Sequence, residues 1–334
     1  MKVILAAPFY HQPRGNKVTV ERISHGLELA GMETEIISST DKNTYSKPLK
    51  ADIYHGFHAT HFFHFMKNRG EQLEPYILTL TGTDFNHDLF QSEKRENVIQ
   101  SLNGAKGIHV FSKGAKDTVI KELPHLEEKI FVIPQGVSPF SLNDRLKRKE
   151  SGTFLFILPA GIRKVKNVPF AIEQLASLKE KYKNIRLWIV GPIIEEEEGK
   201  VVQELLNKHS HWVQYIGSYA HKDMGAIYSQ GDVILNTSFS EGQSSALLES
   251  MALGIPVLVS NNDGNSSIVK HKETGLIYSK AVEFLSFAEA LIKEKDLRET
   301  LSFNGKKYIS EHHSWDKEIT SLISIYKNFI LERV

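Results

Sequence analysis

The stretch "DVILNTSFSEGQSSALLESMALGIPVLVS", residues 232–260, decides the fold of the second half of the chain. It begins with an apolar run that is typical of a buried strand, and a polar loop follows. A helical pattern then runs from Ser244 to Leu253 and ends at Gly254, because glycine tolerates the positive φ that often closes a helix. A second apolar run completes a strand–helix–strand unit, which predicts parallel strands covered by helices.

The same alternation of short apolar runs and helical patterns continues through the whole chain. Several runs are apolar throughout, as parallel strands that are covered on both faces should be. Two comparable halves with this alternation predict an α/β protein that consists of two doubly wound domains. The expected strands are residues 3–7, 35–38, 52–57, 76–81, 107–111, 130–134, 153–158, 186–190, 212–216, 232–236, 256–260 and 275–278.

The boundary between the halves is expected in "SPFSLNDRLKRKESG", residues 138–152, which is polar, charged and without an apolar period. We therefore assign residues 1–145 to the first domain and residues 150–312 to the second. The basic part of this stretch, "RLKRK", is typical of a solvated linker, and a peripheral membrane contact is the alternative. Doubly wound sheets bind ligands at the carboxyl ends of their strands, so a cleft between the two domains is the expected site.

The composition is that of a globular protein, with 334 residues of which 41% are hydrophobic and 24% are charged. A net charge of +1 argues against nucleic-acid binding, which needs a basic face. The chain has no cysteine, which excludes zinc–thiolate sites and cysteine nucleophiles and fits a reducing, cytoplasmic location. No apolar run approaches the ~20 residues of a membrane span, and the first residues are interpreted as a buried strand rather than a signal peptide.

The loop and helix of residues 237–253 carry the strongest chemical pattern. The free N–H groups and the dipole at the start of the helix form an anion site that suits a phosphate. Glu241 flanks this helix start, and Glu249 lies further along the helix, roughly 7.5 Å from Ser244 along its axis. Carboxylates are good acceptors for sugar and ribose hydroxyls. From the spacing alone, an interpretation without a ligand is equally good. In it, Glu241 only stabilises the helix dipole and Glu249 is an exposed residue in the middle of the helix.

"EGQSSALLE", residues 241–249, resembles the paired-glutamate motif of glycosyltransferase family 4, whose members have the GT-B fold and retain the anomeric configuration. The resemblance covers nearly all of the second domain and, more loosely, the first. Within the family, the chain is similar to short proteins with a single glycosyltransferase domain, and to selenosugar synthases in "LTGTD" and in the loop after the first strand. Three further segments resemble family motifs: "AGIRKVKN" at 160–167, "PVLVSNNDGNSSIVKHKETGLIY" at 256–278 and "HHSWDKE" at 312–318.

The resemblance implies a nucleotide-diphosphate sugar as donor, with a UDP-sugar expected, and neither a metal nor another cofactor. It implies that Glu241 binds hydroxyls of the donor sugar and that Glu249 binds the ribose. Arg163 and Lys166 would clamp the diphosphate, whose charge grows as the glycosidic bond breaks; a solvated basic loop is the alternative. The GT-B fold implies an interdomain cleft and a C-terminal helix, residues 313–334, that crosses back to the first domain. The phosphate cradle would consist of Gly242, Gln243, Ser244 and Ser245.

Two strand ends of the first domain are also candidates for ligand contact. Gly15 and Asn16 follow the first strand in "PRGNKVT", where glycine lets the backbone approach the donor phosphate or an acceptor; a plain surface loop is the alternative. Thr83 and Asp84 follow the fourth strand in "LTLTGTDFNHD" and are candidates for a sugar or acceptor contact. The histidine that relatives usually carry in this region has no counterpart in "TGTD", and His87 lies nearby.

Residues 55–65, "HGFHATHFFHF", have a histidine at every third position. The stretch is expected to span the end of the third strand and the start of the following helix. A metal site needs three or four convergent ligands, and this junction separates the imidazoles, so no metal is expected. His58 lies at the turn and is the candidate for a donor or acceptor contact, with packing or surface filling as the alternative.

The expected reaction moves a hexose-type sugar to an acceptor with retention, by attack on the same face, and a donor phosphate oxygen takes the acceptor proton. Other classes stay open: a non-catalytic nucleotide-sugar-binding protein, a sugar-nucleotide epimerase, or a serine hydrolase that uses Ser244 with Asp263 and His271. The hydrolase pattern is incomplete, because Ala246 replaces the second glycine of the nucleophile elbow. The nucleotide base, the sugar, the acceptor and the oligomeric state are not determined by the sequence.

Overall fold

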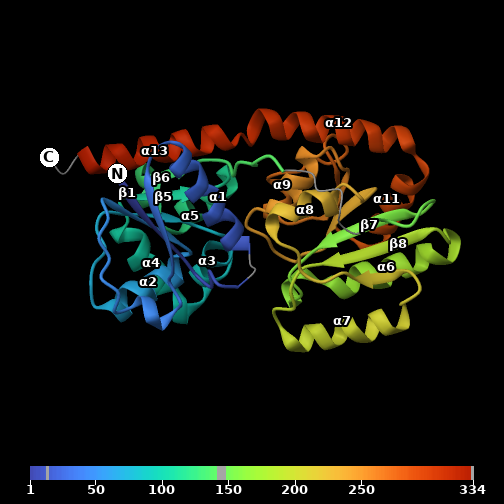
Figure 1. Ribbon diagram of the computed structural model, residues 1–334, viewed down its shortest axis with the longest axis horizontal. Coiled ribbons are helices and arrows are strands. Elements are labelled where there is room, and N and C mark those ends of the chain that lie inside the picture. Colours follow the sequence, from blue (N-terminus) through green and yellow to red (C-terminus); the bar gives the residue numbers. More distant parts are fainter. Residues whose placement is uncertain (13–14, 141–147, 332–334) are drawn as a thin grey trace. The chain divides into compact units, whose positions relative to one another are not determined.

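The computed structural model describes residues 1–12, 15–140 and 148–331 and divides into two compact units. Unit 1 comprises Met1–Ser138 with His313–Val334, and unit 2 comprises Pro139–His312. Each unit contains one six-stranded parallel sheet with helices packed on it, which confirms the predicted α/β class with two doubly wound sheets (Figure 1). Residues 141–147, which include most of the basic run "RLKRK", lie outside the described residues.

The sheet of unit 1 has the strand order β2-β1-β3-β4-β5-β6. The chain places β2 on one side of β1 and β3 on the other, so the carboxyl ends of β1 and β3 form a topological switch point. The strands are β1 (Lys2–Ala7), β2 (Glu33–Ser38), β3 (Ile53–Phe57), β4 (Tyr76–Thr79), β5 (Gly107–Val110) and β6 (Ile130–Val132). The α-helices are α1 (Gly15–Leu29), α2 (Ala59–Arg69), α3 (Thr83–Asn86), α4 (Ser92–Gly104), α5 (Lys113–Glu122) and α13 (Trp315–Leu331).

The sheet of unit 2 has the order β12-β11-β10-β7-β8-β9, so its switch point lies between β7 and β10. The strands are β7 (Phe154–Pro159), β8 (Ile185–Val190), β9 (Val213–Tyr215), β10 (Val233–Asn236), β11 (Val257–Ser260) and β12 (Leu276–Tyr278). The α-helices are α6 (Val168–Lys181), α7 (Glu196–Lys208), α8 (His221–Tyr228), α9 (Ser245–Ala252), α10 (Asp263–Ser266), α11 (Ala281–Lys293) and α12 (Lys295–His312).

Every strand that the sequence predicts is present, with ends that differ from the expected ones by two residues or fewer. The strands are apolar because helices cover the sheets: β1, for example, is buried from Val3 to Ala7, and β10 is buried throughout. The helix expected at residues 244–253 is α9. Hydrophobic periodicity therefore located both sheets correctly.

A buried ion pair fastens α13 to α1 in unit 1. Arg22 Nε and Nη2 donate to Glu318 Oε2 (3.0 Å) and Oε1 (2.8 Å), and the two side chains are 4% and 0% exposed. The backbone N–H of Gly136 donates to the same carboxylate (3.1 Å), and Trp315 Nε1 donates to the Arg22 carbonyl (3.2 Å). Apolar packing alone would allow α13 to shift along α1. These directional hydrogen bonds form only in one register of the two helices.

A chain of buried hydrogen bonds crosses β3, β4 and β5 beneath α13. It joins Tyr326 Oη to His55 Nδ1 (2.6 Å), His55 Nε2 to Thr79 Oγ1 (2.6 Å), Thr79 Oγ1 to His109 Nδ1 (2.9 Å), and His109 Nε2 to the Ile133 carbonyl (2.9 Å). Burial, the largest cause, lowers the pKa of both histidines, so each neutral ring has one N–H. Because a carbonyl only accepts, His109 must donate to Ile133. Every hydrogen bond of the series then donates in the same direction, from Tyr326 toward Ile133.

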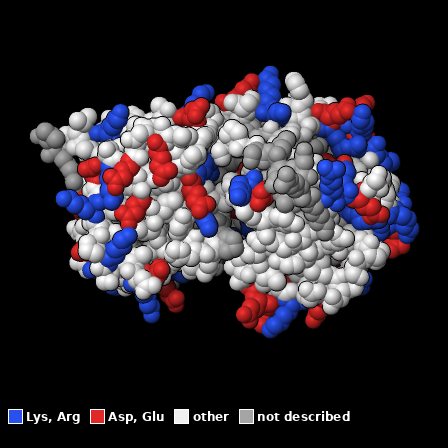
Figure 2. Space-filling model, viewed as in Figure 1, with Lys and Arg blue, Asp and Glu red and all other residues white. Residues whose placement is uncertain are grey.

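The charged side chains on the face shown in Figure 2 are of both signs and are interspersed over both units. This distribution accords with the near balance of 41 basic and 40 acidic residues. Every helix in the described part of the chain is too short or too polar to span a membrane.

We expect Arg22→Met to lower the free energy of unfolding by about 3–5 kcal/mol, because it leaves the Glu318 carboxylate buried without its cation. Urea denaturation followed by circular dichroism measures this loss. The matched control is Lys17→Met, since Lys17 pairs with Glu21 at 3.8 Å on the surface of the same helix. Its effect should stay within about 0.5 kcal/mol, and an equal loss in both variants would contradict the role of the buried pair.

Candidate active site

Two loops at the switch point of the unit 2 sheet hold the candidate site. β7 and β10 are direct neighbours, with Phe156 opposite Val233 and Ile157 opposite Ile234. The loop after β7 and the loop after β10 therefore leave the same edge of the sheet side by side. The first carries Arg163 and Lys166, and the second carries Glu241, so three residues predicted to act together do lie on adjacent loops.

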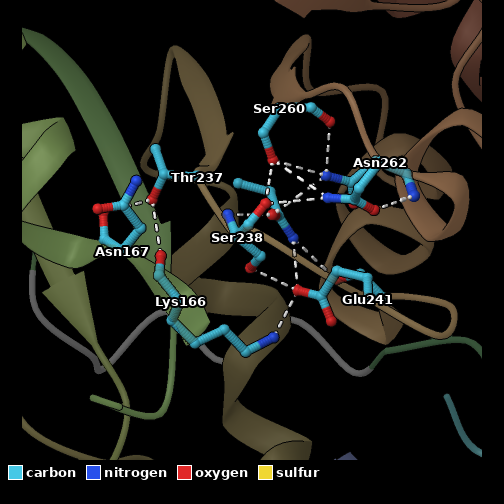
Figure 3. A network of polar contacts seen from close by, with 10 residues as sticks. Lys166, Asn167, Thr237, Ser238, Glu241, Ser260 and Asn262 are labelled. Carbon is cyan, nitrogen blue, oxygen red and sulfur yellow. Dashed lines mark hydrogen bonds and ion pairs between the residues drawn. The ribbon is translucent and has the colours of Figure 1, made fainter. Parts of the chain in front are cut away.

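Hydrogen bonds to the backbone tie the two loops together. Thr237 Oγ1 donates to the carbonyl groups of Lys166 (2.9 Å) and Asn167 (3.1 Å), as Figure 3 shows. The N–H of Phe239 donates to the Val165 carbonyl (2.9 Å). These contacts hold the side chains of both loops in place before any ligand arrives, which is the preorganisation that a charge-stabilising site needs.

Lys166 and Glu241 form the centre of this site. Lys166 Nζ donates to Glu241 Oε1 (2.5 Å), and the same oxygen accepts from Asn236 Nδ2 (3.0 Å) and Ser238 Oγ (2.7 Å) (Figure 3). The two charged side chains are only 16% and 10% exposed. Burial raises the pKa of Glu241, but the charge of Lys166 and the three hydrogen bonds outweigh it and hold the pKa below its ordinary value. Glu241 is therefore an ionised acceptor and not a proton donor.

An outer layer of polar residues from the end of β11 and the loop after it supports the site. Ser260 Oγ (2.6 Å) and Asn262 Nδ2 (3.0 Å) both donate to the Ser238 carbonyl (Figure 3). Gly264, at the start of α10, lies so close that a Cβ there would come within 2.6 Å of the Glu241 carbonyl. Neither Asn236 nor Ser238 was predicted from the sequence; a polar residue at the end of an apolar strand was the available signal.

Arg163 lies at the start of the short 3-10 helix η4 (Lys164–Lys166) and is partly buried. Across residues 1–12, 15–140 and 148–331, its guanidinium forms neither an ion pair nor a side-chain hydrogen bond, and its Nε is buried without a partner. A partly buried guanidinium without an anion is costly, so this position suits an anionic ligand. Lys166, in contrast, already has Glu241 as its counter-ion.

The helix α9 begins directly after the loop that follows β10. Its N-cap residue, Ser244, adopts an extended backbone, and its side chain does not cap the first-turn N–H groups. Gly242, Gln243, Ser244 and Ser245 are all partly exposed, as a surface that receives a ligand must be. The positive end of the helix dipole thus lies on the loop that also carries Glu241.

Glu249, the second glutamate of the motif, is buried on α9, with a side chain that is 8% exposed. Its Oε1 lies 2.7 Å from His221 Nε2, and its Oε2 accepts from the Tyr228 hydroxyl (3.1 Å). Both partners lie on α8, and sequence analysis identified neither. The alternative of an exposed mid-helix glutamate is therefore wrong for Glu249.

In unit 1, the Asp84 carboxylate is fully buried and binds the loop around it. It accepts from the backbone N–H groups of Thr81, Gly82, Phe85 and Ala59 at 2.9–3.2 Å. Gly82 has a φ of 124°, which a residue with a side chain rarely adopts. The direct sugar contact expected for Asp84 does not fit a side chain with 0% exposure, because no surface is left for a ligand to touch.

His58 follows β3 and has an unusual backbone. Its φ is 71°, a strained value for a residue other than glycine, and its Nδ1 is buried without a hydrogen-bond partner in the described residues. Its ring lies 4.5 Å from that of His61, centroid to centroid. Burial, with a smaller contribution from the charge of His58, lowers the pKa of His61 to about 4. The four histidines of the period-three stretch thus differ, since His55 is in the core and His64 is exposed.

The remaining candidates of unit 1 lie at the surface. Gly15 is exposed at the first position of α1, and Asn16 is partly exposed beside it. Thr83 is exposed at the first position of α3, and His87 is exposed, with Nδ1 3.1 Å from Gln91 Nε2. In the described part of the chain, no group of three or more histidine, aspartate or glutamate side chains is arranged to hold a metal ion.

The serine hydrolase alternative is not supported by the geometry. Ser244 Oγ accepts a hydrogen bond from Asn236 Nδ2 (3.5 Å), and His271 Nδ1 accepts one from the backbone N–H of Ile277 (2.9 Å). Among the described residues, His271 bonds neither Ser244 nor Asp263, so the three side chains do not form a triad.

Comparison with known proteins identifies the family. The model of the glycosyl transferases group 1 family matches residues 142–308. "Glycosyltransferase 1 domain-containing protein 1" of Xenopus tropicalis is 31% identical over 322 residues, which cover 91% of both chains. The chain belongs to the glycosyl transferases group 1 family. An uncharacterized glycosyltransferase of Methanocaldococcus jannaschii is 23% identical over 273 residues, which cover 76% of this chain and 69% of that protein.

Solved structures of other proteins have the same fold as this group 1 member. Sucrose-phosphate synthase from Thermosynechococcus elongatus has a TM-score of 0.81 at 15% identity, over 99% of this chain and 100% of its own. HepE from Anabaena, solved in complex with UDP-glucose, has a TM-score of 0.74 at 15% identity, over 97% and 99% of the two chains. These likenesses confirm the GT-B fold that the sequence motifs predicted.

We expect Asp84→Asn to lower the free energy of unfolding by on the order of 2 kcal/mol, because an amide cannot accept from four backbone N–H groups as a carboxylate does. Thermal or urea unfolding measures the loss. Thr83→Ala is the matched control, since Thr83 is exposed in the same loop, and its effect should stay within about 0.5 kcal/mol. An Asp84→Asn variant as stable as the wild type would contradict the loop-binding role.

Proposed function

We propose that this chain is a retaining glycosyltransferase of family 4, which moves a hexose-type sugar from a nucleotide-diphosphate sugar to an acceptor. The observation that supports this most strongly is the site at the unit 2 switch point. There the Lys166–Glu241 pair, the Arg163 guanidinium, which has no anion partner in the described residues, and the start of α9 lie on adjoining loops. The ionised Glu241 carboxylate, which can accept hydrogen bonds from sugar hydroxyls, thus lies close to several N–H groups that can donate to a phosphate.

The diphosphate is bound by Arg163, Lys166 and the first turn of α9. Arg163 has a planar guanidinium whose N–H groups can donate to the diphosphate. No protein anion in the described residues occupies these groups. Lys166 has three N–H donors, so it can bind a phosphate oxygen while it stays on Glu241. The backbone N–H groups of Gln243, Ser244 and Ser245, with the close approach that Gly242 permits, complete the cradle.

The donor sugar lies against Glu241, and the ribose lies against Glu249. Glu241 is held ionised by Lys166, which makes it a strong acceptor for hydroxyl groups. Glu249 lies further along α9, at roughly 7.5 Å from Ser244 along the helix axis. A diphosphate at the start of the helix therefore separates two sugars, each next to one carboxylate. A UDP-sugar is the donor we propose, and the complex of the fold relative HepE with UDP-glucose supports it.

The reaction breaks the bond between the anomeric carbon and the diphosphate oxygen and forms a bond from the acceptor oxygen on the same face. The acceptor proton passes to the departing diphosphate oxygen, so no protein base is required. Negative charge grows on the diphosphate as the bond breaks, and Arg163, Lys166 and the α9 dipole are already in place to stabilise it. The buried, ionised state of Glu241 excludes it as the acid of this step.

Unit 1 supplies acceptor contacts and further donor contacts. His58 has a strained backbone and a buried nitrogen without a partner among the described residues, both of which are typical of a functional position. We assign acceptor or sugar contact to His58 and Thr83, and donor contact to Gly15 and Asn16 at the start of α1. Asp84 shapes the loop that presents Thr83.

A donor screen by thermal shift is the first test. UDP-, GDP- and ADP-sugars are compared, and a ligand present at 100 times its dissociation constant adds about 2.7 kcal/mol of stability. For a unit of this size, that raises the melting temperature by roughly 5–10 °C. We expect one nucleotide class to stand out, with UDP-sugars first. If no nucleotide sugar raises the melting temperature, the assignment of the donor site is wrong.

Transfer assays then test the residues. Lys166→Ala and Glu241→Ala should each lower kcat/KM by at least about 100-fold, since each removes a charge held against the reacting groups. Lys164→Ala is the matched control, because Lys164 is exposed in the same loop, and it should keep near-normal activity. Wild-type-like transfer in either site variant would refute the assignment. A wild type that binds donor yet turns over none with any acceptor would favour the non-catalytic alternative.

A further inference from the structure

The Glu249 carboxylate is held from both sides by one helix. His221 is the first residue of α8 and Tyr228 is the last, seven positions on, so both project from one side of the helix. His221 Nε2 lies 2.7 Å from Oε1, and the Tyr228 hydroxyl lies 3.1 Å from Oε2. The Phe140 ring covers His221 and Tyr228 at centroid distances of 5.3 Å and 6.2 Å and limits how the imidazole can turn.

The protons of this cluster can be assigned from hydrogen-bonding rules. An ionised carboxylate only accepts, so Nε2 of His221 carries a proton and donates it to Glu249. Burial first, and then the charge of Glu249 and its hydrogen bond, raise the pKa of Tyr228 well above its ordinary value. The phenol therefore stays protonated and donates to the other carboxylate oxygen.

Two donors on different oxygens fix the plane and the rotation of the Glu249 carboxylate. Each ionised oxygen has about two acceptor directions, so one direction on each oxygen remains after His221 and Tyr228 have bound. Two hydroxyls on neighbouring carbons can donate to both oxygens at once, and the 2′- and 3′-hydroxyls of a ribose are such a pair.

We infer that His221 and Tyr228 are positioning residues that make Glu249 a two-point receptor for ribose, and that the donor must therefore be a ribonucleoside diphosphate sugar. This rests on the proposed function, and it adds a specificity. A 2′-deoxy donor, such as a sugar linked to deoxythymidine diphosphate, lacks one hydroxyl and leaves one fixed acceptor direction unfilled. A site built to bind a hydroxyl rejects the analogue that lacks it.

The test measures nucleotide binding by calorimetry, so no acceptor is needed. The probes are UDP, GDP and ADP, each paired with its 2′-deoxy counterpart, which keeps the base constant within a pair. For the nucleotide that binds, the wild type should prefer the ribose form by about 10- to 100-fold, because the lost hydrogen bond is made to a charged group.

Three variants separate positioning from folding. His221→Leu should bring the ribose preference down to about threefold or less, whereas His221→Gln, whose amide can still donate, should keep most of it. Tyr228→Phe keeps the ring and removes only the hydroxyl, so it should lower the preference without unfolding the protein. His211→Leu, an exposed histidine elsewhere in unit 2, is the control and should leave the preference unchanged.

The outcomes distinguish this inference from the proposed function. Binding without a ribose preference in the wild type, or an unchanged preference in both His221→Leu and Tyr228→Phe, overturns the positioning role and leaves the glycosyltransferase assignment in place. Failure of the wild type to bind any of the six nucleotides overturns both.

Discussion

The parallel pairing of β7 with β10 is the constraint on which the candidate site depends. These strands are far apart in the sequence, yet they are neighbours in the sheet, and each is followed by a loop at the same edge. Thr237 then ties the second loop to the backbone of the first. Without this pairing, Lys166 and Glu241 would be two solvated side chains on unrelated loops; with it, they form a partly buried pair with charges fixed in place.

Both units use buried polar groups, but with different chemical consequences. In unit 1, the series of hydrogen bonds beneath α13 ends on a carbonyl, and each polar side-chain atom in it has a hydrogen-bond partner. In unit 2, Glu249 has two fixed donors and retains acceptor capacity, and Arg163 has no protein anion in the described residues. A satisfied network stabilises a fold, whereas an incomplete one defines where a ligand of matching chemistry binds.

Arg163 and Lys166 were predicted from the resemblance of their loop to a family motif, and Glu241 from that resemblance and from its place beside a helix start that follows an apolar strand. The same reasoning missed His221. It lies 28 residues before Glu249 on a different helix, and neither its spacing nor its type distinguishes it from a surface histidine. Asp84 shows the reverse failure, because its strand-end position suggested a ligand contact, but the surrounding N–H groups occupy its carboxylate.

The sequence by itself determined the twelve strands, the α/β class and the strand ends that carry charged residues, because hydrophobic periodicity is a local property of the chain. Only the tertiary structure decided which charges meet, which are buried and which way the protons point. Those properties depend on segments that are distant in sequence. The lowered pKa of Glu241 depends on Lys166 from another loop, and the two donors on Glu249 depend on the packing of α8 against α9.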